Sequence, residues 1–273
     1  MEDLGTRICS GDVLVVPGVY DALTAALAEK AKFEAVFLSG SAVAYSQIGR
    51  PDIGLLTMTE MAVALDRIRD RINIHIFVDA DSGYGNAFNV GRTIRAFERA
   101  GASGIQIEDQ INTKPMDQVG QRPLVSIETM VGKLKASLDS RISEKTLISA
   151  RTDAMFSGGL ELALERACLY AEVGADIIFV EGLNKLEDRV RLCNQFEGKV
   201  PLLYNLINSS NDDGPIPQEL EEEGYSIVLF PGAVIGAAAN AANQALEYLS
   251  GNDGPSVSHA VTDLIDAEKY LKN

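Results

Sequence analysis

The regular alternation of short apolar runs with helical patterns is the feature that most constrains how this chain can fold. Continuous runs of Val, Ile, Leu and Phe are typical of parallel strands that are buried on both faces of a sheet. Eight such runs are predicted strands: Val13–Val16, Ala35–Leu38, Ile74–Asp79, Gly104–Glu108, Leu147–Arg151, Ile177–Glu181, Leu202–Asn205 and Ile227–Pro231. A helical pattern follows each of them: Ala22–Lys30, Met58–Arg69, Asn89–Ala100, Ile127–Ser140, Leu160–Val173, Leu186–Phe196, Ile216–Glu223 and Ala233–Leu249. Eight strand–helix units in 273 residues predict an α/β fold, a (β/α)8 TIM barrel, and the alternative is a doubly wound open sheet.

Three of the predicted helices end in the same way, with a glycine placed between the helix and the next strand. Gly101, Gly174 and Gly224 stand in the sequences RAGAS, EVGAD and EEGYS. Glycine is typical of this position because the backbone there adopts a positive φ. Residues 1–250 are therefore predicted to form one catalytic barrel domain. Residues 251–273 are predicted to form a turn-rich linker and an amphipathic helix that packs on the barrel or on a neighbouring subunit.

The balance of charges and the sparse Cys and His residues exclude several classes of protein. The chain has 24 Lys and Arg against 39 Asp and Glu, a net charge of −15, which argues against binding to nucleic acids or anionic membranes. No apolar stretch approaches the ~18 residues of a membrane span, and the N-terminus is too polar for a signal peptide. Cys9, Cys168 and Cys193 are far apart, as expected of a reduced cytoplasmic protein. His75 and His259 are interpreted as structural or exposed.

Acidic residues end two neighbouring predicted strands, where the active site of a TIM barrel forms. Asp79 and Asp81 belong to the sequence DADSGYGN, and Glu108 to EDQ. In extended geometry Asp79 and Asp81 would share a face. Without His or Cys nearby, their oxygens predict a hard cation, Mg²⁺ or alternatively Mn²⁺. The alternative is that the two Asp residues cap the next helix or pair with Arg92.

Three further charged residues have both a functional and a structural interpretation. Arg151 at the next strand end is a candidate clamp for a substrate carboxylate, or it forms a salt bridge with Asp153 or Glu181. Glu181 is then either a functional acid or a structural partner of Arg151. Asp52 in GRPDIG is either a turn residue or a residue that reaches into the mouth of the barrel.

Several strand ends and loops together resemble the isocitrate lyase/phosphoenolpyruvate mutase superfamily over almost the whole chain. The motifs occur in order, from VPGVYDALTAALAEKAKFEAVFLSGSAVA through GRPDIGLLTMTEM, DADSGYGNAFNVGRTIRAFERAGASGIQIEDQ and LISARTDA to GADIIFVEG. The resemblance implies a modified barrel whose last helix is swapped between subunits, in a homodimer or homotetramer. It also implies a small 2-oxo or 2-hydroxy di- or tricarboxylate as the substrate.

The same resemblance assigns roles to individual residues. Asp79, Asp81 and Glu108 match the residues that surround Mg²⁺ in the family. The predicted catalytic residues are Asp52, Lys114, Arg151 and Glu181, and the predicted substrate-binding residues are Ser39, Gly40, Ser41, Tyr84, Arg151 and Asn205. The Ser39–Ser41 segment would hold the substrate carboxylate through backbone N–H groups, and Asp52 would lie near the reacting group.

The loop after Glu108 distinguishes the branches of the family. Lyases for isocitrate, 2-methylisocitrate and dimethylmalate carry Lys-Arg-Cys-Gly-His there, and their Cys protonates the departing carbanion. This chain reads KPMDQ, so Lys114 is kept and Met116 replaces the acid. Phosphonomutases and phosphonopyruvate hydrolases have Pro-Lys-x-Asn-Ser in the loop and usually a His at the position of Glu181, so their chemistry is disfavoured.

Oxaloacetate decarboxylases of the superfamily need no loop Cys, because solvent can protonate the pyruvate enolate. A 2-oxo acid chelates Mg²⁺, and the metal stabilises the developing enolate charge. We therefore predict a Mg²⁺-dependent decarboxylase or C–C lyase for oxaloacetate-like 2-oxo dicarboxylates. One alternative is a 2-methylisocitrate or 2,3-dimethylmalate lyase whose acid is water or Tyr45. The other is a non-catalytic protein that binds Mg²⁺ and oxo acids.

Overall fold

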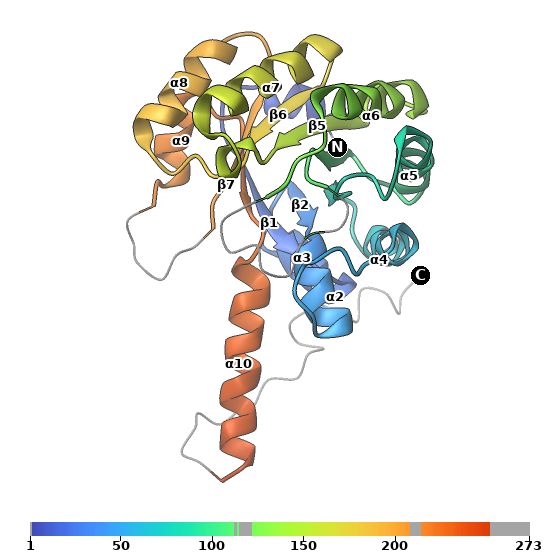
Figure 1. Ribbon diagram of the computed structural model, residues 1–273. Coiled ribbons are helices and arrows are strands. Elements are labelled where there is room, and N and C mark those ends of the chain that lie inside the picture. Colours follow the sequence, from blue (N-terminus) through green and yellow to red (C-terminus); the bar gives the residue numbers. More distant parts are fainter. Residues whose placement is uncertain (1, 112–113, 115–121, 208–213, 252–273) are drawn as a thin grey trace.

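The computed structural model describes residues 2–111, 114, 122–207 and 214–251 (Figure 1). Within these residues, eight parallel strands form a closed barrel in chain order: β1 (Leu14–Val19), β2 (Ala35–Leu38), β3 (His75–Asp79), β4 (Gly104–Glu108), β5 (Leu147–Thr152), β6 (Ile177–Val180), β7 (Leu202–Asn205) and β8 (Ile227–Phe230). The first and last strands pair from Leu14↔Ile227 to Pro17↔Phe230. This pairing confirms the TIM barrel and excludes the open sheet.

Helices surround the barrel, one or more after each strand (Figure 1). The helices that follow the eight strands are α2 (Ala22–Lys30), α4 (Met58–Arg71), α5 (Ala87–Arg99), α6 (Ile127–Ser140), α7 (Gly159–Val173), α8 (Leu186–Phe196), α9 (Pro217–Glu223) and α10 (Ala233–Leu249). All of them were predicted from the helical pattern, with boundaries that differ by at most two residues.

Alternation along the strands divides the apolar side chains into two cores, because successive residues point to opposite faces. One core fills the barrel: Leu14, Val16, Ala35, Phe37, Phe77, Leu147, Ile177, Phe179, Leu203, Ile227 and Leu229, with Leu4 and Ile8 of α1 (Leu4–Ile8). The other lies between the strands and the helices, and includes Val36, Ile76 and Ile105. Gly104 leaves room for the Phe77 ring, whose atoms would lie 2.3 Å from a Cβ at that position.

Several short elements were not predicted. They are α1, α3 (Gly40–Val43), the π-helix η1 (Ala44–Ile48) and the 3-10 helix η2 (Ala154–Phe156). Strand β1 also continues to Val19, past the predicted end at Val16. Pro17 and Gly18 resemble a turn in the sequence, but Gly18 is needed in the strand because a Cβ there would lie 2.2 Å from the Pro231 carbonyl oxygen.

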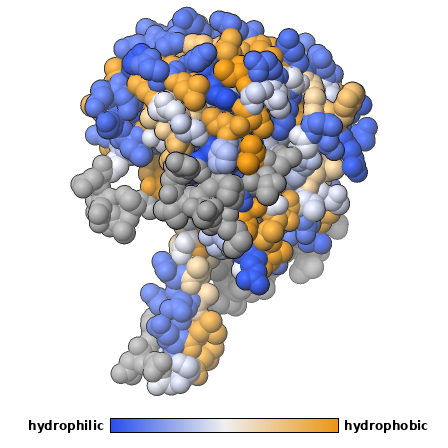
Figure 2. All heavy atoms as spheres, in the orientation of Figure 1, coloured by the Kyte–Doolittle hydropathy of each residue, from blue (hydrophilic) through white to orange (hydrophobic). Residues whose placement is uncertain are grey.

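The last helix, α10, extends away from the barrel in Figure 1, and none of its residues is buried. Figure 2 shows hydrophobic atoms on its exposed surface, and Leu246 and Leu249 are 65% and 78% exposed. Its predicted swap with another subunit stays a prediction. The predicted C-terminal helix, with His259, falls on residues 252–273, outside the described residues. No helix in the described part of the chain is long and apolar enough to cross a membrane.

Candidate active site

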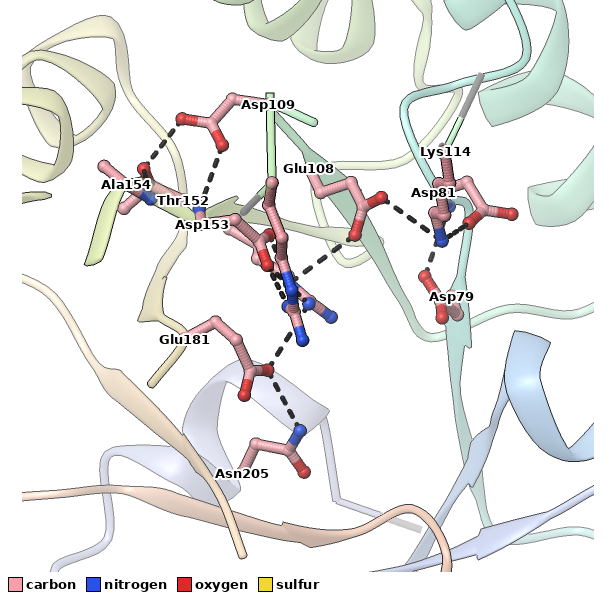
Figure 3. Close-up of polar contacts among 12 residues, drawn as sticks. Asp79, Asp81, Glu108, Asp109, Lys114, Thr152, Asp153, Ala154, Glu181 and Asn205 are labelled. Atoms are coloured by element: carbon pink, nitrogen blue, oxygen red, sulfur yellow. Dashed lines mark hydrogen bonds and ion pairs between the residues drawn. The ribbon is translucent and has the colours of Figure 1, made fainter. Parts of the chain in front are cut away.

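Five of the predicted site residues lie at one end of the barrel, where the strands end (Figure 3). Asp79, Glu108 and Asn205 are the last residues of β3, β4 and β7. Arg151 is the penultimate residue of β5, and Glu181 directly follows β6. Because all strands are parallel, their carboxyl ends meet at one mouth. The barrel register places Glu108 beside Arg151.

Asp81 lies in a turn and not in extended backbone. Its φ is +47°, so the expectation that Asp79 and Asp81 share a face of one strand is wrong. The turn still holds both carboxylates together, and the Asp81 backbone N–H donates to Asp79 Oδ1 at 3.2 Å. Helix α5 is capped by Asn86, which accepts from the N–H groups of Phe88 and Asn89. The side chains of the two Asp residues are therefore not needed as caps.

The ammonium group of Lys114 lies among three carboxylates, and Figure 3 shows two of them, those of Asp81 and Glu108. Its Nζ is 2.7 Å from Asp81 Oδ1, 3.2 Å from both carboxylate oxygens of Asp52 and 3.5 Å from Glu108 Oε1. Asp52 thus reaches into the mouth, and its role near the reacting group stays a prediction. Burial opposes the charge of Lys114, but attraction to Glu108, Asp81 and Asp52 outweighs it and raises the pKa of Lys114. Lys114 therefore keeps its proton and acts as a fixed positive charge.

The two buried carboxylates at the strand ends hold protons unusually firmly. Burial, followed by repulsion from Asp81, raises the pKa of Asp79 to about 7. Burial raises the pKa of Glu108 to about 8, although Lys114 and Arg151 attract its charged form. A divalent cation bound here would favour the ionised carboxylates, so protons and metal would compete for the same oxygens.

The donor chemistry of the mouth fits a hard cation. Glu108 Oε1 is buried and accepts no hydrogen bond, although the Lys114 ammonium lies 3.5 Å away, and Asp79 ends the neighbouring strand β3 with a further carboxylate. Among the described residues, however, no three acidic, His or Cys side chains already converge as a metal cluster. The ammonium of Lys114 contacts Asp81 and Glu108 in this arrangement. We conclude that Asp79, Asp81 and Glu108 supply suitable donors, and their role as metal ligands stays a prediction.

Arg151 is held by acidic neighbours, which confirms the salt bridges considered for it. Its Nε and Nη2 donate to the two carboxylate oxygens of Asp153 at 2.8 and 2.9 Å. Nη2 also lies 3.4 Å from Glu181 Oε2, and Nε lies 3.5 Å from Glu108 Oε2. Glu181 is thus a partner of Arg151. The further role of Arg151 as a carboxylate clamp is not tested by these contacts.

The predicted substrate-binding residues flank this cluster. A Cβ at Gly40 would lie 3.2 Å from Asp79 Oδ2, so glycine lets the Ser39–Ser41 backbone approach that carboxylate closely. Asn205 Nδ2 donates to Glu181 Oε2 at 3.0 Å, and Asn205 Oδ1 is buried without a partner. The Tyr84 hydroxyl is likewise buried without a partner in the described structure.

Two cavities adjoin these residues. One, of about 750 Å³, is lined by Glu181 and Asn205 together with the residues that follow β6 and β7. The other, of about 330 Å³, is lined in part by Asp81, Glu108 and Lys114. Its remaining lining includes Leu56, Met58, Tyr84 and Ile111. Both open volumes are large enough for part of a small organic acid.

A buried polar network behind the mouth was not predicted. Asp109 is fully buried and accepts hydrogen bonds from Thr152 Oγ1 (2.7 Å), the Asp153 N–H (3.0 Å), Arg166 Nη1 (3.0 Å) and Tyr170 O–H (2.8 Å). Asp153 also pairs with Arg122, whose guanidinium lies 4.2 Å from the centre of the Phe156 ring. The sequence offered one indication of this network: Arg166 and Tyr170 are four residues apart on α7 and therefore lie on the same face of the helix.

Comparison with known proteins places this chain in a family. The family model for phosphoenolpyruvate phosphomutase matches residues 7–250. The chain is 41% identical to a 2,3-dimethylmalate lyase of Eubacterium barkeri over 84% of this chain and 78% of that protein. It is 42% identical to a 2-methylisocitrate lyase of Aeropyrum pernix over 87% of this chain and 76% of that protein.

Solved structures of proteins from the same superfamily superpose closely on this chain. An oxaloacetate acetylhydrolase bound to 3,3-difluorooxalacetate has a TM-score of 0.90 and 26% identity, covering 99% of this chain and 94% of that chain. A phosphonopyruvate hydrolase bound to oxalate and Mg²⁺ has a TM-score of 0.83 and 28% identity, covering 98% and 95%. The chain is therefore an enzyme of the lyase class and belongs to the phosphoenolpyruvate phosphomutase family, within the PEP mutase/isocitrate lyase superfamily.

Proposed function

We propose that this enzyme is a Mg²⁺-dependent decarboxylase, or a closely related C–C lyase, that acts on oxaloacetate-like 2-oxo dicarboxylates. The observation that carries the proposal is the position of the Lys114 ammonium among the carboxylates of Asp52, Asp81 and Glu108, which raise its pKa. The pKa of Tyr84 is also raised well above its usual value by burial and then by Asp81. Two polar groups at the mouth are therefore poor acids, which suits a reaction whose product takes its proton from solvent.

The residues of the chain have separate tasks in this reaction. When bound, Mg²⁺ supplies Lewis-acid stabilisation of the charge that develops on the 2-oxo oxygen. Asp79, Asp81 and Glu108 would hold the cation, and Lys114 would stabilise developing negative charge through its fixed positive charge. The Ser39–Ser41 backbone, with Arg151, would orient the substrate carboxylate. The C3–C4 bond of oxaloacetate breaks, CO₂ leaves, and solvent protonates C3 to give pyruvate.

Pyruvate formation from oxaloacetate tests the proposal. The purified enzyme with Mg²⁺ is expected to exceed the rate of Mg²⁺ alone, and chelation is expected to remove the excess. Asp79→Asn and Glu108→Gln should each lower the rate by at least about a hundredfold, because each removes a charged oxygen donor. Glu222→Gln, an exposed acidic position on α9, is the matched control and should keep the rate. A wild-type rate equal to that of the metal alone would refute the function.

The second candidate is a lyase of the 2,3-dimethylmalate or 2-methylisocitrate type. The 41% and 42% identities to such lyases favour it. The 330 Å³ cavity, with Leu56, Met58 and Ile111 in its lining, also offers apolar surface to a branched substrate. Water or Tyr45, which is 53% exposed, would then replace the acid that Met116 cannot supply. Pyruvate and a second acid released from a 2-alkylmalate, without oxaloacetate turnover, would identify this activity.

Two properties accompany the proposed function. The enzyme is proposed to be a homodimer or homotetramer, assembled through α10, and a cytoplasmic location follows from its cysteine pattern.

A protein that binds oxo acids without catalysis would show tight oxalate binding and no turnover with any 2-oxo or 2-hydroxy acid. That result would contradict both enzymatic candidates.

A further inference from the structure

A buried lysine lies directly behind the turn that carries Asp81. Lys133 of α6 is 3% exposed and occupies the apolar face of the helix with Met130, Leu134 and Ser137. Its Nζ donates to the Ser82 carbonyl oxygen at 2.8 Å. An ammonium group is costly to bury, and a neutral aliphatic side chain would fill the same space without that cost. The position of this charge therefore needs an explanation other than packing.

The turn that follows β3 is strained. Asp81 and Tyr84 have φ values of +47° and +59°, and Gly83 and Gly85 also have positive φ. Left-handed backbone at a residue other than glycine is conformationally unfavourable and persists only when the surroundings hold it. Gly83 also packs against α5 so closely that a Cβ would lie 2.4 Å from Val90 Cγ2.

Three consecutive carbonyl groups of this turn are each fixed by a donor from a different element. The Asp81 carbonyl accepts from the Glu108 N–H of β4 at 2.8 Å. The Ser82 carbonyl accepts from Lys133 of α6 at 2.8 Å, and the Gly83 carbonyl accepts from Thr93 Oγ1 of α5 at 3.3 Å. Lys133 is the charged donor of the three, and charged donors form the stronger hydrogen bonds.

We propose that Lys133 is a positioning residue that holds the 81–85 turn in its left-handed conformation, so that the Asp81 carboxylate stays beside Glu108 and Lys114. Lys133 acts through the Ser82 carbonyl, to which its ammonium group donates a hydrogen bond, and not as a ligand itself. The predicted effect of Lys133 on metal affinity rests on the proposed function, because the position of Asp81 changes this affinity only if Asp81 is a metal ligand. The hold on the turn itself exists without any metal.

Two measurements on the full-length enzyme test this role. The first is amide hydrogen exchange without metal, followed at Gly83, whose N–H donates to the Ala80 carbonyl at 2.8 Å. The second is the affinity for Mn²⁺, measured by electron paramagnetic resonance. Lys133→Met should speed exchange in the turn and weaken Mn²⁺ binding about tenfold or more, the usual effect of losing an outer partner. Lys133→Arg keeps a charged donor and should restore both properties to within about threefold.

Ser137→Ala is the matched control. Ser137 is fully buried on the same helix and donates to the Lys133 carbonyl at 2.9 Å, so its loss perturbs α6 without reaching the turn. It should change neither exchange at Gly83 nor Mn²⁺ affinity. If Lys133→Met does not fold, Lys133→Gln is measured in its place, because its shorter neutral side chain lacks the charged donor.

Unchanged exchange at Gly83 in the substituted enzyme would overturn the proposal. Faster exchange spread equally over the core strands would overturn it as well, because a merely structural role predicts that result. If the wild type binds no Mn²⁺, the proposed function fails, and exchange at Gly83 still decides the role of Lys133.

Discussion

Glu108 is a buried carboxylate at the mouth of the barrel, 3.5 Å from both Lys114 Nζ and Arg151 Nε. Its side chain is 3% exposed, and burial raises its pKa to about 8 from the usual 4.5. Between these pH values the folded chain binds more protons at Glu108 than the unfolded chain does. The contribution of Glu108 to the free energy of unfolding is therefore full at low pH and is lost as the pH rises towards 8.

Glu108→Gln should remove this pH dependence, because a Gln side chain resembles the protonated acid. With a chelator present, the variant and the wild type should unfold at similar temperatures at pH 5. At pH 8.5 the variant should unfold at the higher temperature, by roughly 2–4 °C for each kcal/mol. Mg²⁺ should reverse that order at pH 8.5, since it binds the ionised Glu108 of the wild type. Thermal unfolding curves that keep a constant difference across this pH range would contradict the assignment.

At the scale of elements, Asp109 joins β4, β5 and α7. It accepts from Thr152 and the Asp153 N–H on the β5 side and from Arg166 and Tyr170 on α7. Because Asp153 in turn pairs with Arg151, this network supports the mouth from behind. Neighbouring residues of a strand face opposite sides, so Glu108 points to the mouth while Asp109 points to the helices.

Asp109→Asn is expected to lower the free energy of unfolding by about 3–5 kcal/mol, because it leaves Arg166 buried without its charged partner. Urea denaturation measures this change. Asp66→Asn, at an exposed position on α4, is the control and should alter stability by less than about 0.5 kcal/mol. A loss below about 1 kcal/mol for Asp109→Asn would show that the network is not an important support.

At the scale of the whole molecule, α10 is a helix that the described part of its own chain leaves without a buried face. It has 17 residues and none of them is buried, although Leu246, Tyr248 and Leu249 are large apolar side chains. A helix gains most of its stability by packing one face against a partner. We expect a second copy of the chain to cover α10.

Leu246→Glu should therefore dissociate the proposed oligomer, because it places a charge in an apolar interface. Light scattering after size-exclusion chromatography measures the mass, for which a monomer is 29.3 kDa. Gln244→Glu adds the same charge two residues away, on a different side of the helix, and should leave the assembly intact. A wild-type protein with the mass of a monomer would contradict the expectation.

The sequence alone determined the architecture, since each barrel strand and its helix are specified by local patterns. The positive φ of Gly101, Gly174 and Gly224, at +95°, +106° and +111°, was predictable because helix ends favour glycine there. The family and most residues of the mouth were predictable too, because strand ends of a parallel barrel converge.

Only the tertiary structure decided which charges meet. Lys114 is 62 residues from Asp52 in the chain, and Lys133 is 51 residues from Ser82, so no local pattern connects them. The left-handed conformation of Asp81 was also not predictable from the sequence, because it depends on hydrogen-bond donors from β4, α5 and α6. The sequence "EDQINTKPMDQ" has Met116 where the family resemblance predicts an acidic Cys in lyases, and the fold brings Lys114 to three carboxylates that raise its pKa. Local patterns determine elements, whereas the balance of burial and charge at a site depends on every element that surrounds it.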